Sequence, residues 1–171
     1  MLDKLLYLKP ILRLRRNHAL EHATLNTLSE SGQHGMLAGY SDPGGFWIVG
    51  SLKLEELQQA IDKALARLQG GDAALAISPH CGTNFAVAGL FAGALSWLAM
   101  LGAGSSWRRR FEQLPLVIVL SMLGFMAARP LGPLLQARVT TLASPGKMHI
   151  RGIDVHRRGA MIIHRVIVRH P

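Results

Sequence analysis

Apolar residues recur at helical spacing in two stretches of the chain. The first stretch predicts an amphipathic helix over residues 10–30, with Pro10 in its first turn and Ser31-Gly32 at its end. The second predicts an amphipathic helix over residues 52–69, which Gly70-Gly71 terminates. Each helix has one apolar face to bury, so we expect both to pack on a common core.

Short runs of β-prone residues predict strands between and after these helices. Two runs, around 35–40 and 46–50, flank the turn-forming sequence Asp42-Pro43-Gly44-Gly45 and predict a hairpin. A short apolar run at 73–78 predicts a further strand, and the segments MHIRGIDVH and AMIIHRVIVRH predict a terminal β-hairpin. The expected fold class is α+β, a small mixed sheet with two amphipathic helices.

Two long apolar runs interrupt this domain. Residues 84–104 carry no charge, and residues 114–135 carry only Arg129. Each run is long enough to cross a bilayer, so the sequence predicts a two-helix transmembrane hairpin. A buried helical hairpin in a soluble protein is the alternative, but a chain of 171 residues rarely encloses two such runs in its core.

The expected organisation is therefore one α+β domain divided by a membrane anchor. Residues 1–83 form its N-terminal part, residues 84–136 the hairpin, and residues 137–171 the β-hairpin that completes the domain. An even number of crossings leaves both soluble parts on one side of the membrane.

Charge changes this interpretation only locally. The formal net charge is +9, yet residues 1–83 are balanced, with eight basic and eight acidic residues, whereas residues 138–171 carry seven basic residues against one acidic residue. This basic tail suits anionic lipid headgroups, and nucleic acid is not an expected partner because no recognition motif accompanies it. A lone cysteine and the lack of a cleavage-site pattern favour a cytoplasmic domain on an inner membrane.

Candidate chemistry lies in the first predicted helix. His18, Glu21 and His22 form an H-x-x-E-H arrangement, in which the i, i+4 spacing places both imidazoles on one helix face. There they can hold one zinc ion, and Glu21 can exchange protons as a general acid and base. The alternative is that these three side chains face solvent or bond to one another.

Cys81, the only cysteine, is the candidate third ligand. It precedes the first apolar helix, and a helix N-terminus stabilises a thiolate. His80 is the competing ligand on the same loop, because adjacent residues rarely point at the same ion. Two imidazoles, one thiolate and an open fourth position are typical of a catalytic Zn²⁺ site.

These residues carry three resemblances. The segment HALEHATLNTL is similar to the inverted zinc motif of pitrilysin-type peptidases, and together with SPHCGT it resembles S-ribosylhomocysteine lyase. That resemblance implies an α+β fold, His18, His22 and Cys81 as ligands, and Glu21 as acid and base. The chain lacks the peptidases' downstream glutamate and the lyase's second cysteine. Most of its length resembles an uncharacterised bacterial family, domain of unknown function 6391, which implies no activity.

The expected function is that of a membrane-anchored zinc enzyme of hydrolase or lyase type, acting on an unidentified substrate such as a peptide or a membrane-associated molecule. The alternative is a non-catalytic membrane protein, with a structural metal site or none, whose basic tail docks a partner or anionic lipid. The oligomeric state stays open. The remaining histidines are expected to be ordinary surface residues: His34, His149, His156, His164 and His170.

Overall fold

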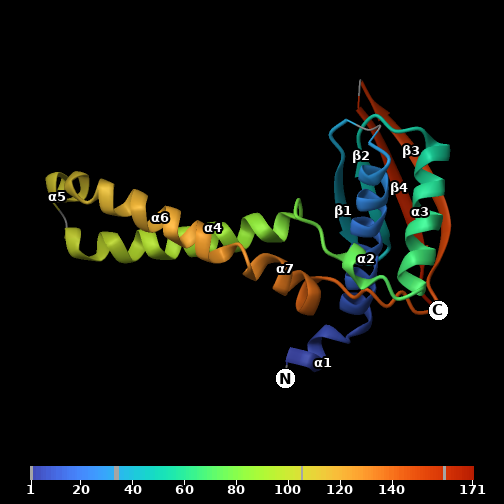
Figure 1. The fold of residues 1–171 in the computed structure, drawn as a ribbon, viewed down its shortest axis with the longest axis horizontal. Coiled ribbons are helices and arrows are strands. Elements are labelled where there is room, and N and C mark those ends of the chain that lie inside the picture. Colours follow the sequence, from blue (N-terminus) through green and yellow to red (C-terminus); the bar gives the residue numbers. More distant parts are fainter. Residues whose placement is uncertain (1, 33–34, 105, 160) are drawn as a thin grey trace. The chain divides into compact units, whose positions relative to one another are not determined.

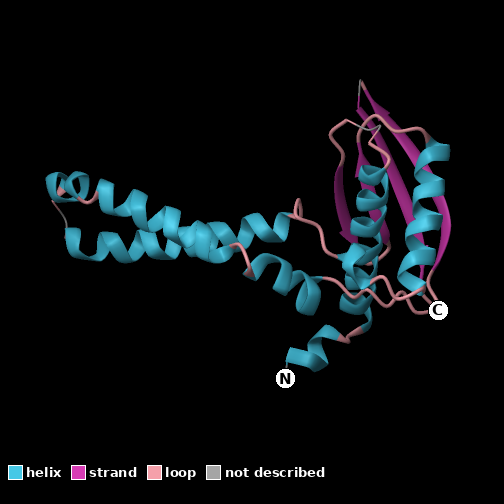
Figure 2. Cartoon of the chain, viewed as in Figure 1, coloured by secondary structure: helices cyan, strands magenta, loops and turns pink. Residues whose placement is uncertain are grey.

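The computed structural model describes residues 2–32, 35–104, 106–159 and 161–171. They divide into two compact units, one made of Met1–Ser78 with Gln136–Pro171 and the other of Pro79–Leu135. In the first unit, two long helices lie on one face of a four-stranded sheet (Figures 1 and 2). The second unit is wholly helical among its described residues.

The elements of the first unit follow the order expected of an α+β domain. Its helices are α1 (Leu2–Leu6), α2 (Lys9–Glu30), α3 (Leu54–Gln69), the 3-10 helix η1 (Ala73–Ala76) and the π-helical turn η3 (Gln136–Thr140). Its strands are β1 (Ala38–Asp42), β2 (Gly45–Val49), β3 (His149–Arg158) and β4 (Met161–Arg169). Both predicted amphipathic helices and both predicted hairpins are thus confirmed.

The sheet is antiparallel throughout, in the order β1-β2-β4-β3. The expectation of a mixed sheet is therefore wrong, and so is the strand expected at residues 73–78, where η1 lies instead. Side chains of α2 bind the carbonyl groups there: Asn26 Nδ2 donates to Leu75 O at 3.0 Å and to Ile77 O at 3.0 Å. Because these acceptors are satisfied locally, the segment needs no strand partner.

A single apolar core lies between the helices and the sheet. Leu20 of α2, Leu57 and Ile61 of α3, and Phe46 and Ile48 of β2 are all 0% exposed. Tyr40 of β1 is 68% exposed, because successive residues of a strand point to opposite faces and α2 and α3 cover only one of them.

A network of polar groups holds the turn between β1 and β2. Arg165 of β4 donates two hydrogen bonds to the carboxylate of Asp42, at 2.7 and 2.9 Å, and its guanidinium lies 4.7 Å from the ring centre of Trp47. The backbone N–H of Gly44 donates to the same carboxylate at 2.7 Å. Burial acts to raise the pKa of Asp42, but the bonds from Arg165 and Gly44 outweigh it and hold this pKa below its ordinary value.

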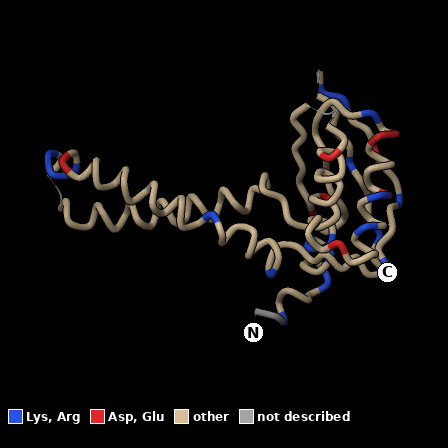
Figure 3. Tube along the Cα trace, viewed as in Figure 1, with Lys and Arg blue, Asp and Glu red and all other residues tan. Residues whose placement is uncertain are grey.

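The second unit contains α4 (Gly82–Met100), the 3-10 helix η2 (Leu101–Ala103), α5 (Trp107–Glu112), α6 (Leu114–Ala128) and α7 (Leu131–Leu135). α4 and α6 pack closely, since a Cβ at Gly124 would lie 2.7 Å from Phe91 O. The hydroxyls of Ser96 and Ser121 also join at 2.6 Å. Figure 3 shows no charge along α4 or α6, whereas α5 carries charges of both signs.

One described helix, Gly82–Ala103, is long and apolar enough to cross a membrane. The second predicted span is broken: Leu114–Ala128 and Leu131–Thr140 meet at an angle of 44° and reach the required length only as a bent pair. The break contains Arg129-Pro130, and proline both lacks an N–H and disfavours helix in the residue before it. The structure therefore supports one apolar span directly, and the two-span hairpin stays a prediction.

Replacing Asp42 tests the turn network. We expect Asp42→Asn to destabilise the first unit by about 1–3 kcal/mol at pH 7, because Arg165 loses a paired charge. Since its pKa is lowered on folding, the wild-type carboxylate stabilises the fold above about pH 4 and this contribution disappears as pH falls below that value. Thermal unfolding, followed by circular dichroism at pH 7 and pH 3, should show the variant's disadvantage shrinking in acid.

Asp154→Asn provides the control, because Asp154 also lies opposite Arg165 in the sheet register but forms no ion pair among the described residues. Its effect should stay within about 0.5 kcal/mol. Equal losses in the two variants would show that the Asp42 network contributes nothing specific.

Candidate metal centre

Helix α2 places His18 and His22 together. The two residues are one helical turn apart, and their ring centres lie 4.2 Å from one another. His22 is 2% exposed, while His18 lies at the edge of the buried surface. The predicted pairing of the two imidazoles on one helix face is confirmed.

Backbone carbonyls orient both rings. The Nδ1 atom of His22 lies 2.8 Å from Ala76 O, and that of His18 lies 3.1 Å from Thr140 O. A carbonyl oxygen only accepts, so each Nδ1 carries the proton, and the lone pair of a neutral ring is then on Nε2. This is the arrangement in which a metal-binding histidine is fixed by a second hydrogen bond.

The chain that leads to Cys81 is anchored close to these rings. Ala76 is bonded to His22, and the side-chain amide of Gln136 bonds to both the N–H and the carbonyl of Ser78, at 2.8 and 3.0 Å. Cys81 follows three residues later as the N-cap of α4 and is 7% exposed. So short a connection limits how far its thiol can lie from the anchored segment.

Three ligand atoms, one each from His18, His22 and Cys81, lie within 4.8 Å of one another. A tetrahedral ion with bonds of about 2.0–2.3 Å requires ligand atoms about 3.5 Å apart. This group could therefore hold a metal ion after small side-chain adjustments. His80, the competing ligand considered above, is exposed and is not part of the group.

Glu21 directly precedes His22 on α2, and its side chain is buried against β1. Its side chain is 4% exposed, and the hydroxyl of Ser41 on β1 donates to its carboxylate at 2.5 Å. A Cβ at Gly39 would lie 2.2 Å from Glu21 Oε1, so only glycine lets β1 pass this close. The H-x-x-E-H pattern identifies Glu21, but neither Ser41 nor Gly39 could be recognised in the sequence because β1 meets α2 only in the folded chain.

Two of the remaining histidines differ from the expectation of ordinary surface residues. His164 is 1% exposed, because the alternation of β4 points it into the covered face of the sheet. His170 is partly buried, and its Nε2 lies 2.8 Å from Asn17 Oδ1. The expectation that these two histidines are surface residues is therefore wrong. His34 lies outside the described residues.

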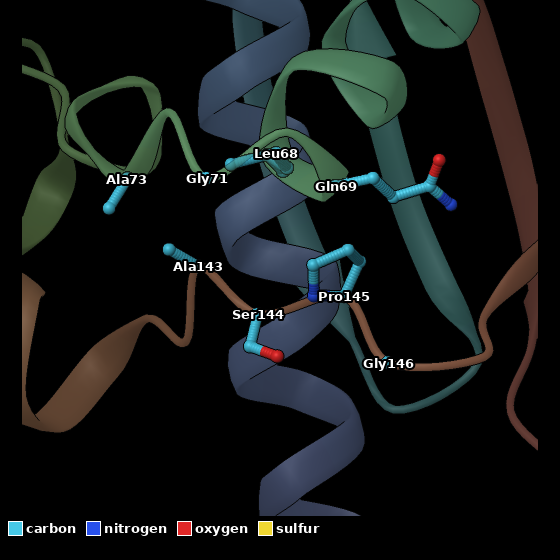
Figure 4. A pocket seen from close by; sticks show the side chains of 8 residues that line it. All are labelled: Leu68, Gln69, Gly71, Ala73, Ala143, Ser144, Pro145 and Gly146. Atoms are coloured by element: carbon cyan, nitrogen blue, oxygen red, sulfur yellow. The ribbon is translucent and has the colours of Figure 1, made fainter.

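A cavity of about 500 Å³ elsewhere in the first unit contains no candidate site residue (Figure 4). Its lining comes from the end of α3, from Gly71 and Ala73 after it, and from residues 143–146, and none of the labelled side chains is ionisable. Backbone and small side chains dominate this hollow, so it does not extend the chemistry of the histidine pair.

A comparison with models of protein families finds a match over most of the chain. A family model described as a domain of unknown function, DUF6391, matches residues 13–153. The chain belongs to this family. DUF6391 thereby confirms the family resemblance, and its match spans all three residues of the candidate metal centre.

A curated relative is an uncharacterized protein of Picosynechococcus sp., 37% identical over 105 residues. The alignment covers 53% of the present chain, and the chain spans about half, 51%, of that relative. No solved structure matches. None of these comparisons bears on the resemblance to the zinc peptidases or to the lyase, which stays a prediction.

The contact between Gly39 and Glu21 yields a test of this environment. Gly39→Ala should destabilise the fold by about 1–3 kcal/mol, because the new methyl group forces the Glu21 carboxylate away from Ser41. Gly152→Ala is the matched control in the same sheet, since a Cβ there meets nothing within 4 Å. Thermal unfolding of the two variants gives the comparison.

A double substitution then isolates the cause. In a Glu21→Ala background the carboxylate is absent, so the additional cost of Gly39→Ala should largely disappear, with a coupling energy above about 1 kcal/mol. The same cost in both backgrounds would mean that Gly39 is required for another reason.

Proposed function

We propose that this member of the DUF6391 family is a membrane-anchored zinc enzyme of hydrolase or lyase type. His18, His22 and Cys81 hold the ion, and Glu21 transfers protons. The observation that carries the proposal is the approach of the three ligand atoms to within 4.8 Å of one another, next to a buried carboxylate that a hydroxyl holds in place.

The donor set favours zinc. Two imidazole nitrogens and one sulfur are ligands that Zn²⁺ accepts, and three protein ligands leave one tetrahedral position for another molecule. A zinc ion there would supply Lewis acidity at neutral pH. The carbonyls of Ala76 and Thr140 fix the two rings, so the residues present fit the ion without a change of tautomer.

Glu21 is the proton-transfer group of this proposal. It directly precedes His22 on α2, and the hydroxyl of Ser41 donates a hydrogen bond to its carboxylate. A carboxylate fixed in this way can take a proton from a reacting group and return it later in the reaction. Ser41 then acts as a positioning residue for Glu21.

Cobalt substitution tests the site without knowledge of the substrate. We expect full-length protein loaded with Co²⁺ in detergent to show thiolate-to-cobalt absorption, which Cys81→Ser abolishes. His22→Ala should weaken metal binding by at least about tenfold. Glu21→Gln should retain the metal, and added azide should change the visible spectrum of both proteins because one position is open.

Glu30→Gln is the matched control, since Glu30 lies on the same helix but pairs at the surface with Arg67. It should leave metal binding and any zinc-dependent turnover of a peptide mixture unchanged, whereas Glu21→Gln should lower turnover by at least about 100-fold. A spectrum that azide does not alter would show a closed structural site and would overturn the catalytic assignment.

We also propose that α4 and the bent pair α6–α7 anchor the chain in the inner membrane of a bacterium, with the α+β unit in the cytoplasm. Only 17% of the most apolar window of Gly82–Ala103 is buried, which is unlike the core helix of a soluble protein. Large apolar side chains such as Phe85, Leu90 and Trp97 are more than half exposed, and lipid would cover them.

Reporter fusions test this topology. Because β4 pairs with β2, the C-terminus belongs to the same unit as the first helices, and a C-terminal green fluorescent protein should fluoresce. Alkaline phosphatase at the C-terminus should be inactive, whereas the same enzyme inserted after Gly104 should be active on the other side. The reverse pattern would place the α+β unit outside the cytoplasm.

A further inference from the structure

Helix α1 and the link that follows it expose large apolar side chains. Leu5 is 49% exposed, Tyr7 62% and Leu8 49%. Figure 1 shows α1 beyond the end of α2 rather than against the sheet, and the apolar core of the α+β unit includes none of these three residues. Large apolar side chains exposed so close together are typical of a surface that contacts a protein or a membrane.

Arg15 of α2 fixes the position of this segment. Its side chain is 5% exposed, and its guanidinium donates to Leu6 O at 3.3 Å, to Arg138 O at 3.0 Å and to Thr141 O at 3.1 Å. The same guanidinium lies 5.9 Å from the ring centre of Tyr7. One buried cation therefore joins the end of α1 to the turn η3 and the residue that follows it.

These carbonyls belong to the part of the chain that returns from the second apolar run. The run ends at Leu135, and Arg138 follows three residues later, within the bent pair of helices that ends at Thr140. Three residues of chain span at most about 10 Å, so a bilayer that holds the apolar run has its surface close to η3 and to α1. Continuity with the proposed anchor thus indicates lipid as the partner of the exposed side chains.

The charge around this segment favours an anionic lipid surface. Residues 1–17 contain five basic residues and one acidic residue. Lys4, Lys9 and Arg13 are exposed, and so is Arg138. Exposed cations next to exposed apolar side chains are typical of a segment that lies in the membrane interface, where apolar groups enter the headgroup region and cations contact lipid phosphates. A tyrosine suits this depth because its ring is apolar and its hydroxyl is polar.

We propose that α1 and the link to α2 form an interfacial segment that binds the surface of an anionic bilayer. Leu5, Tyr7 and Leu8 enter the headgroup region, and Lys4 and Lys9 contact lipid phosphates. This inference rests on the membrane anchoring proposed above and is independent of the metal chemistry.

The interfacial segment also limits how far the candidate metal centre lies from the membrane. Helix α2 begins at Lys9, and His18 follows nine residues later, which is about 14 Å along a helix. A segment held in the interface at the start of α2 keeps the centre within about that distance of the lipid headgroups. A membrane-associated substrate can then reach it from the bilayer surface.

The two tyrosines of the chain make a specific test, because both are exposed and only Tyr7 belongs to the proposed segment. Tyr40 lies on β1, on the sheet face that α2 and α3 leave open. Full-length protein labelled with fluorotyrosine is placed in nanodiscs of phosphatidylcholine, with and without phosphatidylglycerol, that contain a nitroxide lipid. We expect the fluorine relaxation of Tyr7 to increase at least about threefold more than that of Tyr40, and most strongly with phosphatidylglycerol. The Tyr7→Phe variant assigns the two signals.

Replacing lysines tests the role of charge. Lys4→Gln/Lys9→Gln should lose at least about half of the additional relaxation of Tyr7 in phosphatidylglycerol, because each lysine near an anionic surface strengthens attachment. Lys53→Gln/Lys63→Gln is the matched control, since both of these lysines are exposed but lie on or next to α3. It should leave the relaxation of Tyr7 within about 20% of wild type.

Equal relaxation of Tyr7 and Tyr40 would overturn the proposal. A Tyr7 signal that depends on the number of protein copies per disc would also overturn it, because the partner would then be a second copy of the chain. Equal relaxation in the two lipid compositions, or equal effects of the two lysine pairs, would overturn the assignment of an anionic surface.

Failure of the anchor can be distinguished from failure of the interfacial segment. A chain that stays soluble without detergent would overturn the anchoring, and vesicles of the same composition would then still test Tyr7 against Tyr40. A chain that sediments with membranes, but whose two tyrosines respond alike, would keep the anchor and overturn the interfacial segment. Neither result depends on cobalt binding at the candidate metal centre.

Discussion

Helix α2 is buried along a surface that carries polar side chains, and each of those groups requires a partner. Asn17 is 0% exposed and donates to Asp42 O at 2.7 Å, which fixes the end of β1. His22 and Asn26 bind carbonyls of the η1 segment, and Glu21 accepts from Ser41. An unpartnered polar group in such a place destabilises the fold, so the helix determines where two other segments, β1 and η1, lie.

The same constraint links stability to chemistry. The bonds that orient His22 and Glu21 also hold η1 and β1 against the helix, so the groups proposed to act are part of the packing. A site built in this way is rigid before any ligand arrives, because its side chains are restrained by backbone atoms of neighbouring segments. In the folded chain, His18, Glu21 and His22 therefore have polar partners on neighbouring segments, namely Thr140 O, Ser41 Oγ and Ala76 O.

Periodicity was sufficient to predict the elements whose signal is local. Neighbouring residues alone carry the helical spacing of α2 and α3, the Pro-Gly turn after Asp42 and the alternation of β4. The η1 segment could not be predicted, because its apolar run has the pattern of a short strand. Only in the folded chain does the side chain of Asn26 donate hydrogen bonds to the carbonyls of Leu75 and Ile77. The contacts of Ser41 with Glu21, and the burial of His164, likewise depend on which sheet face the helices cover, and no local pattern reports that.

The double hydrogen bond between Gln136 and Ser78 has a further consequence for how the chain is built. It clasps the point where the polypeptide leaves the α+β unit to the point where it returns. The intervening helices are therefore a module inserted at one seam, with entry and exit side by side. A short linker that joins Ser78 to Gln136 directly would give an α+β unit without the inserted helices and with its core intact. That shortened protein would lack the sulfur of Cys81.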